Sequence, residues 1–311
     1  MRIALIGRSE ILFNCAELLI DEGHEIGLII TAKEAPEYTK TSEGFREFSK
    51  LHKIDFLHSA RLGDENSRQF IKLSGPIDVC VSVNYSGIIP QSIIDLFPLG
   101  ILNAHGGDLP RYRGNACQAW ALINGEKEIG LCVHKMIGGE LDNGLIISRD
   151  YLSIDHNTKI GQCYSWMNSR IPNLFLESIG LLENDPDYVL EKQSTDPKDA
   201  LRCYPRMPVD GKIDWHKGTL DILRLINASS EPFSGAFAEF EGESIIIWQA
   251  ELLMDDEVFV AVAGQVMQVN PEIGYIVIAT GDGKLKINEV EYRGRRVQPY
   301  RIINSIRKRL R

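Results

Sequence analysis

The N-terminal segment constrains the fold most, because it has the pattern of a strand, a helix and a second strand. Residues 2–7 and 25–31 are short apolar runs, and the first run ends in a glycine. Between them, apolar side chains recur at the spacing of one helix face, at Ile11, Leu12, Cys15, Leu18 and Leu19. Two strands joined by a helix form a βαβ unit, in which the strands are parallel and the crossover is right-handed. The sequence therefore predicts an α/β protein with a parallel sheet.

The pattern of the chain changes near residue 185. Before this point, further apolar strands alternate with helical patterns, with strands expected at 77–83, 100–103 and 129–136 and helices at 90–97, 116–123 and 160–182. Beyond it, one helix at 218–228 is followed by short alternating strands at 235–240, 244–252, 264–269, 275–280 and 284–290. Short strands separated by turns are typical of a small β-barrel. We predict an α/β domain over residues 1–185, a linker over 186–208 and a small β domain over 209–311.

Charge and cysteine content narrow the function. The 311 residues include 43 acidic and 34 basic side chains, a net charge of −9, which argues against a protein that coats nucleic acid. Residues 292–311 are the exception, with eight Arg or Lys and no acid. The six cysteines form no C-x-x-C pair, no apolar run approaches the roughly 18 residues of a membrane span, and the N-terminus has the pattern of a strand rather than a signal peptide. These features predict a cytoplasmic protein with no metal site and no membrane partner.

The turn after the first strand lacks the pattern of a dinucleotide site. Gly7 is followed by Arg8-Ser9-Glu10-Ile11 rather than by the further glycines of G-x-G-x-x-G, so NAD binding is not expected. Two interpretations remain for this turn. It is a plain connection, or it contacts a substrate, since ligands of open parallel sheets bind at the carboxyl ends of the strands.

The most informative residues are Asn103, His105 and Asp142. Asn103 and His105 are two positions apart at the end of an apolar strand, so their side chains share one face, and Asp142 follows in a glycine-flanked loop. An Asn amide or a protonated His can stabilise the oxyanion of a tetrahedral intermediate, and His or Asp can accept the proton of an attacking amine. An Asp beside the His would also fix the tautomer of the ring and raise its pKa. A structural role for these residues remains the alternative, and His134 is expected to be a packed strand residue.

A longer pattern around these residues resembles a known family. Asn103-x-His105…Leu109-Pro110-x-Tyr112-Arg113-Gly114 with Leu141-Asp142-x-Gly144 resembles the signature of the N10-formyltetrahydrofolate-dependent formyltransferases. The likeness covers nearly the whole chain, because Tyr204-Pro205-Arg206 and Gly281-Asp282-Gly283-x-Leu285-x-Ile287 resemble the linker and C-terminal barrel of the longer members. The resemblance implies a Rossmann-like parallel-sheet domain followed by a small OB-like β-barrel domain, with N10-formyltetrahydrofolate as the co-substrate.

The resemblance also implies roles for single residues. Asn103, His105 and Asp142 match the catalytic residues of the family. Folate is expected to contact backbone groups of two segments, which are the turn Gly87-Ile88-Ile89 and the loop of Gly138, Gly139, Glu140 and Leu141. Gly106-Gly107-Asp108-Leu109-Pro110 departs from the Ser-Leu-Leu-Pro of many members, which changes the polarity beside the site, and Asn115 stands where some relatives carry Arg.

The family formylates methionyl-tRNA, glycinamide ribonucleotide or the amino group of nucleotide-linked sugars. The members that act on glycinamide ribonucleotide usually lack the C-terminal barrel. The tRNA-acting members typically carry a basic insert after the second strand, whereas the loop at 33–50 has four basic and four acidic residues and would release few counterions from a tRNA. Residues 113–126 look closer to the sugar-nucleotide enzymes. We therefore expect an NDP-amino sugar as acceptor, in surface polysaccharide synthesis, with Ser9 and Glu10 near the sugar ring and Arg206 near a phosphate.

Three alternative functions remain. Methionyl-tRNA formyltransferase is supported by the basic residues 292–311, although the apolar residues there fall near helical spacing and favour an amphipathic terminal helix with a solvated charged face. A formyltetrahydrofolate hydrolase and a non-catalytic folate-binding protein are the other two. A homodimer contact through the terminal helix or the edges of the barrel is also compatible with the sequence.

Overall fold

The computed structural model describes residues 1–35 and 38–311. The described chain forms two compact units. The first consists of Met1–Gly114, Gly130–Tyr151 and Ser165–Arg202, and the second of Asn115–Ile129, Leu152–Tyr164 and Cys203–Arg311. The domain boundaries expected at 185 and 208 stay a prediction. Throughout the described part of the chain, no helix is both long enough and apolar enough to cross a membrane.

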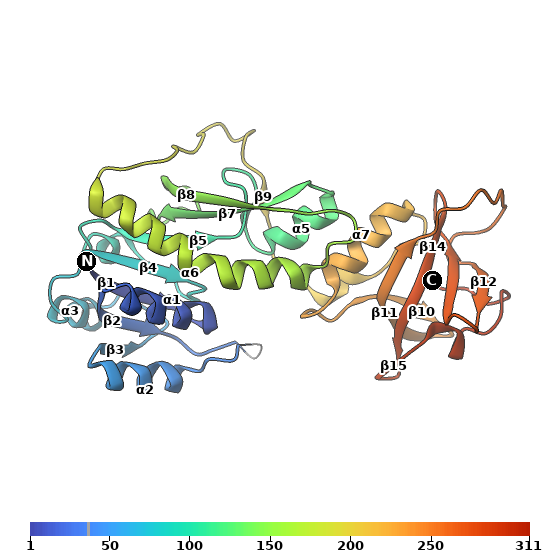
Figure 1. Cartoon of the computed structure of the whole chain (residues 1–311), viewed down its shortest axis with the longest axis horizontal. Coiled ribbons are helices and arrows are strands. Elements are labelled where there is room, and N and C mark those ends of the chain that lie inside the picture. Colours follow the sequence, from blue (N-terminus) through green and yellow to red (C-terminus); the bar gives the residue numbers. More distant parts are fainter. Residues whose placement is uncertain (36–37) are drawn as a thin grey trace. The chain divides into compact units, whose positions relative to one another are not determined.

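The first unit is built on a seven-stranded sheet with the order β3-β2-β1-β4-β5-β7-β8 (Figure 1). Neighbouring strands are parallel across the first part of this order, which comprises β1 (Arg2–Gly7), β2 (Glu25–Thr31), β3 (Asp55–His58), β4 (Val79–Val83) and β5 (Ile101–His105). β7 (Glu128–Lys135) pairs antiparallel with β5, and β8 (Ile146–Ser153) completes the sheet. The predicted α/β class with a parallel sheet is confirmed, and an antiparallel edge extends it.

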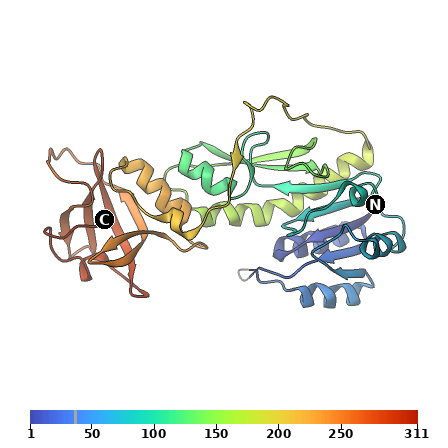
Figure 2. The same ribbon diagram turned by 180° about the vertical axis from the view of Figure 1, so that it is seen from behind.

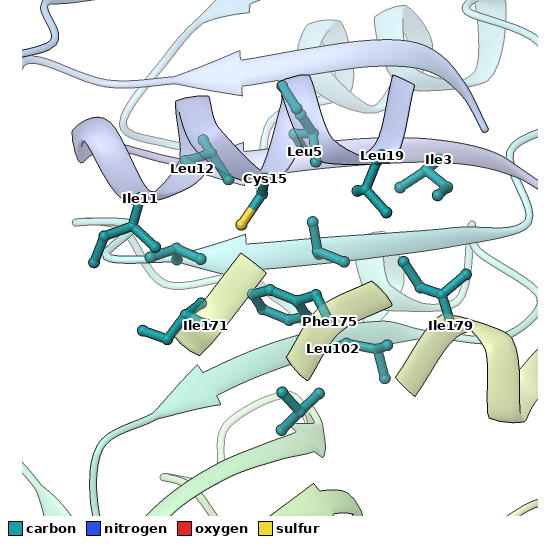
Figure 3. Close-up of a cluster of buried hydrophobic side chains, with 14 of the residues drawn as sticks. Ile3, Leu5, Ile11, Leu12, Cys15, Leu19, Leu102, Ile171, Phe175 and Ile179 are labelled. Carbon is teal, nitrogen blue, oxygen red and sulfur yellow. The ribbon is translucent and has the colours of Figure 1, made fainter. Parts of the chain in front are cut away.

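One face of this sheet is covered by α1 (Ser9–Asp21) and α6 (Ile160–Asn184). Figure 3 shows Leu12 and Cys15 of α1 and Phe175 of α6 gathered over the strands, and all three side chains are fully buried. Apolar residues recur every three or four positions in both helices, so one stripe of each helix faces the sheet.

The opposite face is covered by α3 (Glu65–Leu73) and α4 (Gln91–Ile94), whose isoleucines pack against Ala4 and Ile6. Alternate residues of a strand point to opposite faces, and Ile3 and Leu5 accordingly belong to the first cluster. A strand buried on both faces has a continuous apolar sequence, which explains the run that opens the chain.

Helix α2 (Ser42–His52) corrects the interpretation of residues 33–50 as a loop. Its N-cap Thr41 accepts a hydrogen bond from the Gly44 amide, and its Phe45 and Phe48 are buried. The charged residues of the helix therefore occupy the exposed face of an amphipathic element. Pro36 and Glu37, which belong to the segment whose charge was counted, lie outside the described residues.

The second unit contains an antiparallel sheet with the order β10-β11-β14-β13-β12, and β15 pairs with β14 (orange to red in Figures 1 and 2). The strands are β10 (Ala236–Phe240), β11 (Glu243–Leu252), β12 (Val266–Asn270), β13 (Tyr275–Ala279), β14 (Lys284–Tyr292) and β15 (Arg295–Val297). Helix α7 (Thr219–Ser229) packs against β11 and against α5 (Cys117–Asn124). The remaining short elements are β6 (Arg113–Gly114), β9 (Arg202–Cys203), η1 (Pro208–Gly211) and η2 (Pro299–Arg301). The predicted small C-terminal β domain is confirmed.

The C-terminal segment is not the amphipathic helix that its spacing suggested. Arg311 exchanges two backbone hydrogen bonds with Glu239 of β10, at 2.7 and 2.9 Å, and the Val266 amide of β12 donates to the Lys308 carbonyl at 3.2 Å. Because β10 and β12 are the two ends of the sheet order, the segment bonds to both edges of the barrel. The open edges offer backbone partners that a short helix would leave unpaired, and Leu310 enters the core with 2% of its surface exposed. A homodimer stays a prediction, without a terminal helix as its contact.

Candidate active site

The strand pairing of β5 brings the central residues of the site together. Asn103 of β5 lies opposite His134 of β7, and His105 lies opposite Cys132. Directly opposed residues of antiparallel strands point to the same face, so Asn103, His105 and His134 share one face of the sheet. The side chains follow this register: Asn103 Nδ2 lies 3.3 Å from His134 Nε2.

His105 is held in one orientation by a backbone carbonyl. Its Nε2 lies 2.7 Å from the Tyr112 oxygen, and because a carbonyl only accepts, we assign the proton to Nε2. This contact requires Gly107, since a Cβ there would lie 2.2 Å from the Tyr112 oxygen and 2.6 Å from His105 Nε2. The second ring nitrogen, Nδ1, faces the Asp142 carboxylate.

The Asp142 carboxylate lies between the two histidines. Its Oδ2 is 3.5 Å from His105 Nδ1, and its Oδ1 is 3.6 Å from His134 Nε2. The Gly114 amide also donates a hydrogen bond to Oδ2 at 3.0 Å. The predicted set of Asn103, His105 and Asp142 is thus brought together in the first unit, although the catalytic roles of these residues stay a prediction.

The electrostatics of the site differ from the expectation for His105. Burial lowers the pKa of His105, the negative charge of Asp142 opposes this, and the net pKa lies below the ordinary value of 6.5. The expected rise was therefore wrong in its net direction, because desolvation of the imidazolium outweighs the carboxylate. The tautomer is likewise set by the Tyr112 carbonyl rather than by Asp142. For Asp142, burial raises the pKa, but His134, His105 and the Gly114 amide together lower it below its ordinary value, so the group is charged.

His134 is a residue of this site that the sequence interpretation missed. It is buried in its strand, as expected, but its Nδ1 donates to the Lys135 carbonyl at 3.1 Å, so its Nε2 can accept from the Asn103 amide. His134 therefore orients the amide of Asn103. Finding His134 would have required the register between β5 and β7, because the sequence of one strand does not reveal which residue of the other lies opposite.

The turn after His105 is stabilised from its other side. Arg149 donates to Asp108 Oδ1 at 2.5 Å and to the Leu109 carbonyl at 2.8 Å. Tyr151 also donates to the Asp108 carboxylate. The departure from Ser-Leu-Leu-Pro therefore introduces a carboxylate that is paired with Arg149.

The two segments expected to contact folate lie close to each other. Gly138 donates its amide hydrogen to Gln91 Oε1 at 2.8 Å, and Gln91 begins α4 two residues after the turn Gly87-Ile88-Ile89. A Cβ on Gly138 would lie 2.4 Å from the Gln91 nitrogen, and one on Gly87 would lie 2.3 Å from the Ala60 oxygen. Ile88 is 84% exposed and Leu141 is 41% exposed, whereas Ile89 is buried in the core. Gly139 has a left-handed backbone, and Glu140 accepts a hydrogen bond from Asn143.

The three residues expected to bind a sugar nucleotide have other partners. Ser9 is 1% exposed and lies 3.4 Å from Asn84 Nδ2, and Glu10 accepts hydrogen bonds from Thr39. Arg206 belongs to the second unit, where it donates to the Ala228 carbonyl and to the Ser229 hydroxyl. Burial lowers the pKa of Arg206.

Comparison with known proteins identifies the family. The chain matches the formyl transferase model over residues 1–179 and the model of the formyl transferase C-terminal domain over residues 207–307. It is 30% identical to a methionyl-tRNA formyltransferase of Alkaliphilus oremlandii (99% of this chain, 98% of the relative) and 26% identical to that of Acetivibrio thermocellus (94% and 92%). Among solved structures, an N-formyltransferase of Helicobacter canadensis in complex with folinic acid and dTDP-3-aminofucose shares the fold, with a TM-score of 0.68, 17% identity, and coverage of 92% of this chain and 98% of that one.

These relatives overturn the expectation of an NDP-amino sugar acceptor. Further curated relatives, at 24 to 28% identity and with coverage of at least 94% of this chain, are also methionyl-tRNA formyltransferases. The assignment of Ser9, Glu10 and Arg206 to a substrate was made for that acceptor, and no observation tests whether these residues contact a substrate. The balanced charge of residues 33–50 was taken as evidence against a tRNA acceptor. This inference failed because the charge of one segment says nothing about phosphate contacts made by other segments.

The family models together cover most of the chain, and the relatives match it from end to end. The predicted enzyme class is confirmed, and this protein belongs to the formyl transferase family.

Proposed function

We propose that this protein transfers a formyl group from N10-formyltetrahydrofolate to the amino group of methionyl-tRNA. The observation that carries the proposal is the end-to-end match to curated methionyl-tRNA formyltransferases, which covers 99% of this chain and 98% of the relative in one case. We place the reaction in the cytoplasm, in keeping with six buried cysteines that form no disulfide among the described residues.

The residues beside the site fit a folate. Gly87 and Gly138 pack too closely against the backbone of Ala60 and Gln91 to carry a Cβ, which fixes the course of both segments. The exposed Ile88, Leu141 and Ile137 beside them provide apolar contacts for a flat ring. These residues would hold N10-formyltetrahydrofolate, which supplies a formyl group ready for attack by an amine. The Helicobacter canadensis N-formyltransferase, which shares the fold, was solved with folinic acid bound.

The protein's own residues supply charge stabilisation and a proton acceptor. Asn103 Nδ2, oriented by His134, donates a hydrogen bond to a carbonyl oxygen on which negative charge develops. His105 Nδ1 accepts the proton that the attacking amine loses, because its Nε2 already carries a hydrogen. His105 would return this proton to the folate nitrogen as the bond between that nitrogen and the formyl carbon breaks. The charged Asp142, 3.5 Å away, stabilises the imidazolium that forms.

The second unit offers basic groups for a tRNA. Five exposed arginines have no ion-pair partner among the described residues, namely Arg295, Arg301, Arg307, Arg309 and Arg311. Arg293 and Arg296, in contrast, pair with Glu243 and Glu231. Phosphates are bound through such unpaired guanidinium groups, which release counterions from the nucleic acid.

The test is a formylation assay with the full chain, N10-formyltetrahydrofolate and methionine-charged initiator tRNA. We expect formyl-methionyl-tRNA in the wild type and a rate at least about 100-fold lower in the His105→Ala variant. Formate released without an acceptor would identify a hydrolase, and tight folate binding without turnover would identify a non-catalytic protein. Either result would contradict the proposal.

A further inference from the structure

Asp142 faces both histidines because its backbone turns sharply. Its φ is +47°, in the left-handed region that residues with side chains rarely adopt. Aspartate tolerates this region better than most residues, but the turn still needs support from its surroundings.

Gln193 provides that support through its side-chain amide. Nε2 donates to the Asp142 carbonyl and to the Gly144 carbonyl, each at 2.8 Å, so both amide hydrogens are used. Oε1 accepts from Arg113 Nη2 at 2.7 Å. Because carbonyls only accept and a guanidinium only donates, a single orientation of the amide satisfies all three partners.

The carboxylate end of Asp142 is held by the neighbour of Arg113. Gly114 donates its amide hydrogen to Oδ2 at 3.0 Å, and Arg113 and Gly114 together form β6. Two adjacent residues therefore hold the aspartate at both ends, one directly and one through Gln193.

The main chain near Gln193 is itself anchored to the sheet. Ile146 at the start of β8 donates its amide hydrogen to the Glu191 carbonyl at 2.9 Å, and Glu191 donates back at 3.2 Å. This antiparallel bridge lies two residues before Gln193 and limits where the glutamine can stand. Part of the segment predicted as a linker, 186–208, thus packs beside the active site.

We propose that Gln193 is a positioning residue of this active site, which holds the main chain of Asp142 so that the carboxylate meets His105 and His134, while Arg113 orients the amide. The kinetic consequence rests on the formyl transfer proposed above. The geometric consequence does not, because the state of His105 can be measured without any substrate.

Two substitutions of Gln193 distinguish the effect of its hydrogen bonds from the effect of its size. Gln193→Met keeps the length of the side chain and removes its hydrogen bonds, and Gln193→Glu keeps the contact with Arg113 but sets an oxygen against two carbonyls. Lys192→Ala is the matched control, since Lys192 is the exposed neighbour. We expect both Gln193 variants to lower kcat by about 10- to 100-fold with little change in KM, and Lys192→Ala to leave both parameters at wild-type values.

A second readout is the NMR titration of His105 in the free protein. Asp142, His134 and Arg113 are the charged or titratable groups that face this ring, and only Asp142 raises the pKa of His105. Without the hydrogen bonds from Gln193, the Asp142 carboxylate moves away from His105. His105 should therefore titrate at a lower pH in Gln193→Met and at an unchanged pH in Lys192→Ala.

Wild-type kcat together with an unchanged His105 titration in Gln193→Met would overturn the inference. A fall in kcat that equals the loss of folded protein, without a change in the titration, would also overturn it. If the wild type fails to formylate methionyl-tRNA, the proposed function is wrong, and the His105 titration still decides on the role of Gln193.

Discussion

At the scale of single residues, the site assigns different tasks to the two nitrogens of His105. Nε2 is bound to the Tyr112 carbonyl, and Nδ1 faces Asp142. The hydrogen bond at Nε2 disfavours a flip of the ring, so in the proposed mechanism Nδ1 is set as the proton acceptor before a substrate arrives. Pre-organisation of this kind lowers the reorganisation needed in the transition state.

Removing either polar group of β5 should remove most of the activity. We expect His105→Ala to lower kcat/KM for formyl transfer by about 10²- to 10⁴-fold, through loss of the proton acceptor. Asn103→Ala should lower kcat by about 10²- to 10³-fold, through loss of the oxyanion donor. Steady-state kinetics measure both, with His58→Ala as a control on an exposed histidine. Near-normal rates in either site variant, with normal thermal unfolding, would refute its assignment.

The pH dependence should follow the neutral form of His105. Burial holds the pKa of His105 below 6.5, so the ring is a proton acceptor across the neutral range and is lost as an acceptor when the pH falls through its own pKa. The acid limb of the kcat/KM profile should therefore bend below pH 6.5. A limb that bends above this value would indicate that Asp142 outweighs burial.

The sequence predicted that Asn103, His105 and Asp142 would lie in one site, whereas their catalytic roles stay a prediction. Asn103 and His105 share a strand, and Asp142 follows in a glycine-flanked loop. The contributions of His134 and Gln193 could not be predicted from the sequence, because they depend on which segments lie beside β5 and beside the turn at Asp142. The direction in which the pKa of His105 is shifted could not be predicted either, since it depends on how deeply the ring is buried.

At the scale of elements, long apolar patterns were sufficient to predict helices and strands from the sequence, whereas short amphipathic patterns were not. β1, α1, β2 and α6 were predicted close to their observed bounds, because each buries a continuous stripe. α2, with few buried residues, was taken as a loop. The terminal segment had helical spacing, but the edges of the barrel determined its conformation, which local sequence does not encode.

Helix α6 provides a stability test of the main core. Phe175 is fully buried between α6 and the sheet, so Phe175→Ala should lower the free energy of unfolding by about 3–5 kcal/mol, through lost burial and the cavity left behind. Asn173→Ala, on the exposed side of the same helix, is the control and should have a much smaller effect. Urea unfolding of both variants measures the difference. Equal midpoints would contradict the assignment of Phe175 to this core.

At the scale of the whole molecule, the net charge does not show where basic side chains are exposed. The net charge is −9, yet exposed arginines without ion-pair partners gather in the described residues 295–311. The acids of the same unit neutralise some of the basic side chains and leave others open to a ligand.

This distribution predicts which arginines bind tRNA. The double substitution Arg307→Ala with Arg309→Ala should weaken methionyl-tRNA binding and reduce the slope of log K against log salt by about one per lost phosphate contact. Arg293→Ala, which removes an arginine paired with Glu243, is the matched control and should leave the slope unchanged. Filter binding over a salt series measures both. The same slope in the double variant and the wild type would place the tRNA contacts elsewhere.

The pairing of β7 with β5 also limits which insertions and deletions this gene can tolerate. His134 meets Asn103 through a ladder in which successive side chains alternate between faces. Losing one codon within β7 before His134 would put the residues on one side of the deletion out of register by one and turn their side chains to the opposite face. Either His134 would leave Asn103, or the apolar residues before the deletion would change faces. The same loss in the exposed turn at residues 155–157 would leave the ladder intact. Length variation among related genes should therefore be absent from β7 and allowed in that turn.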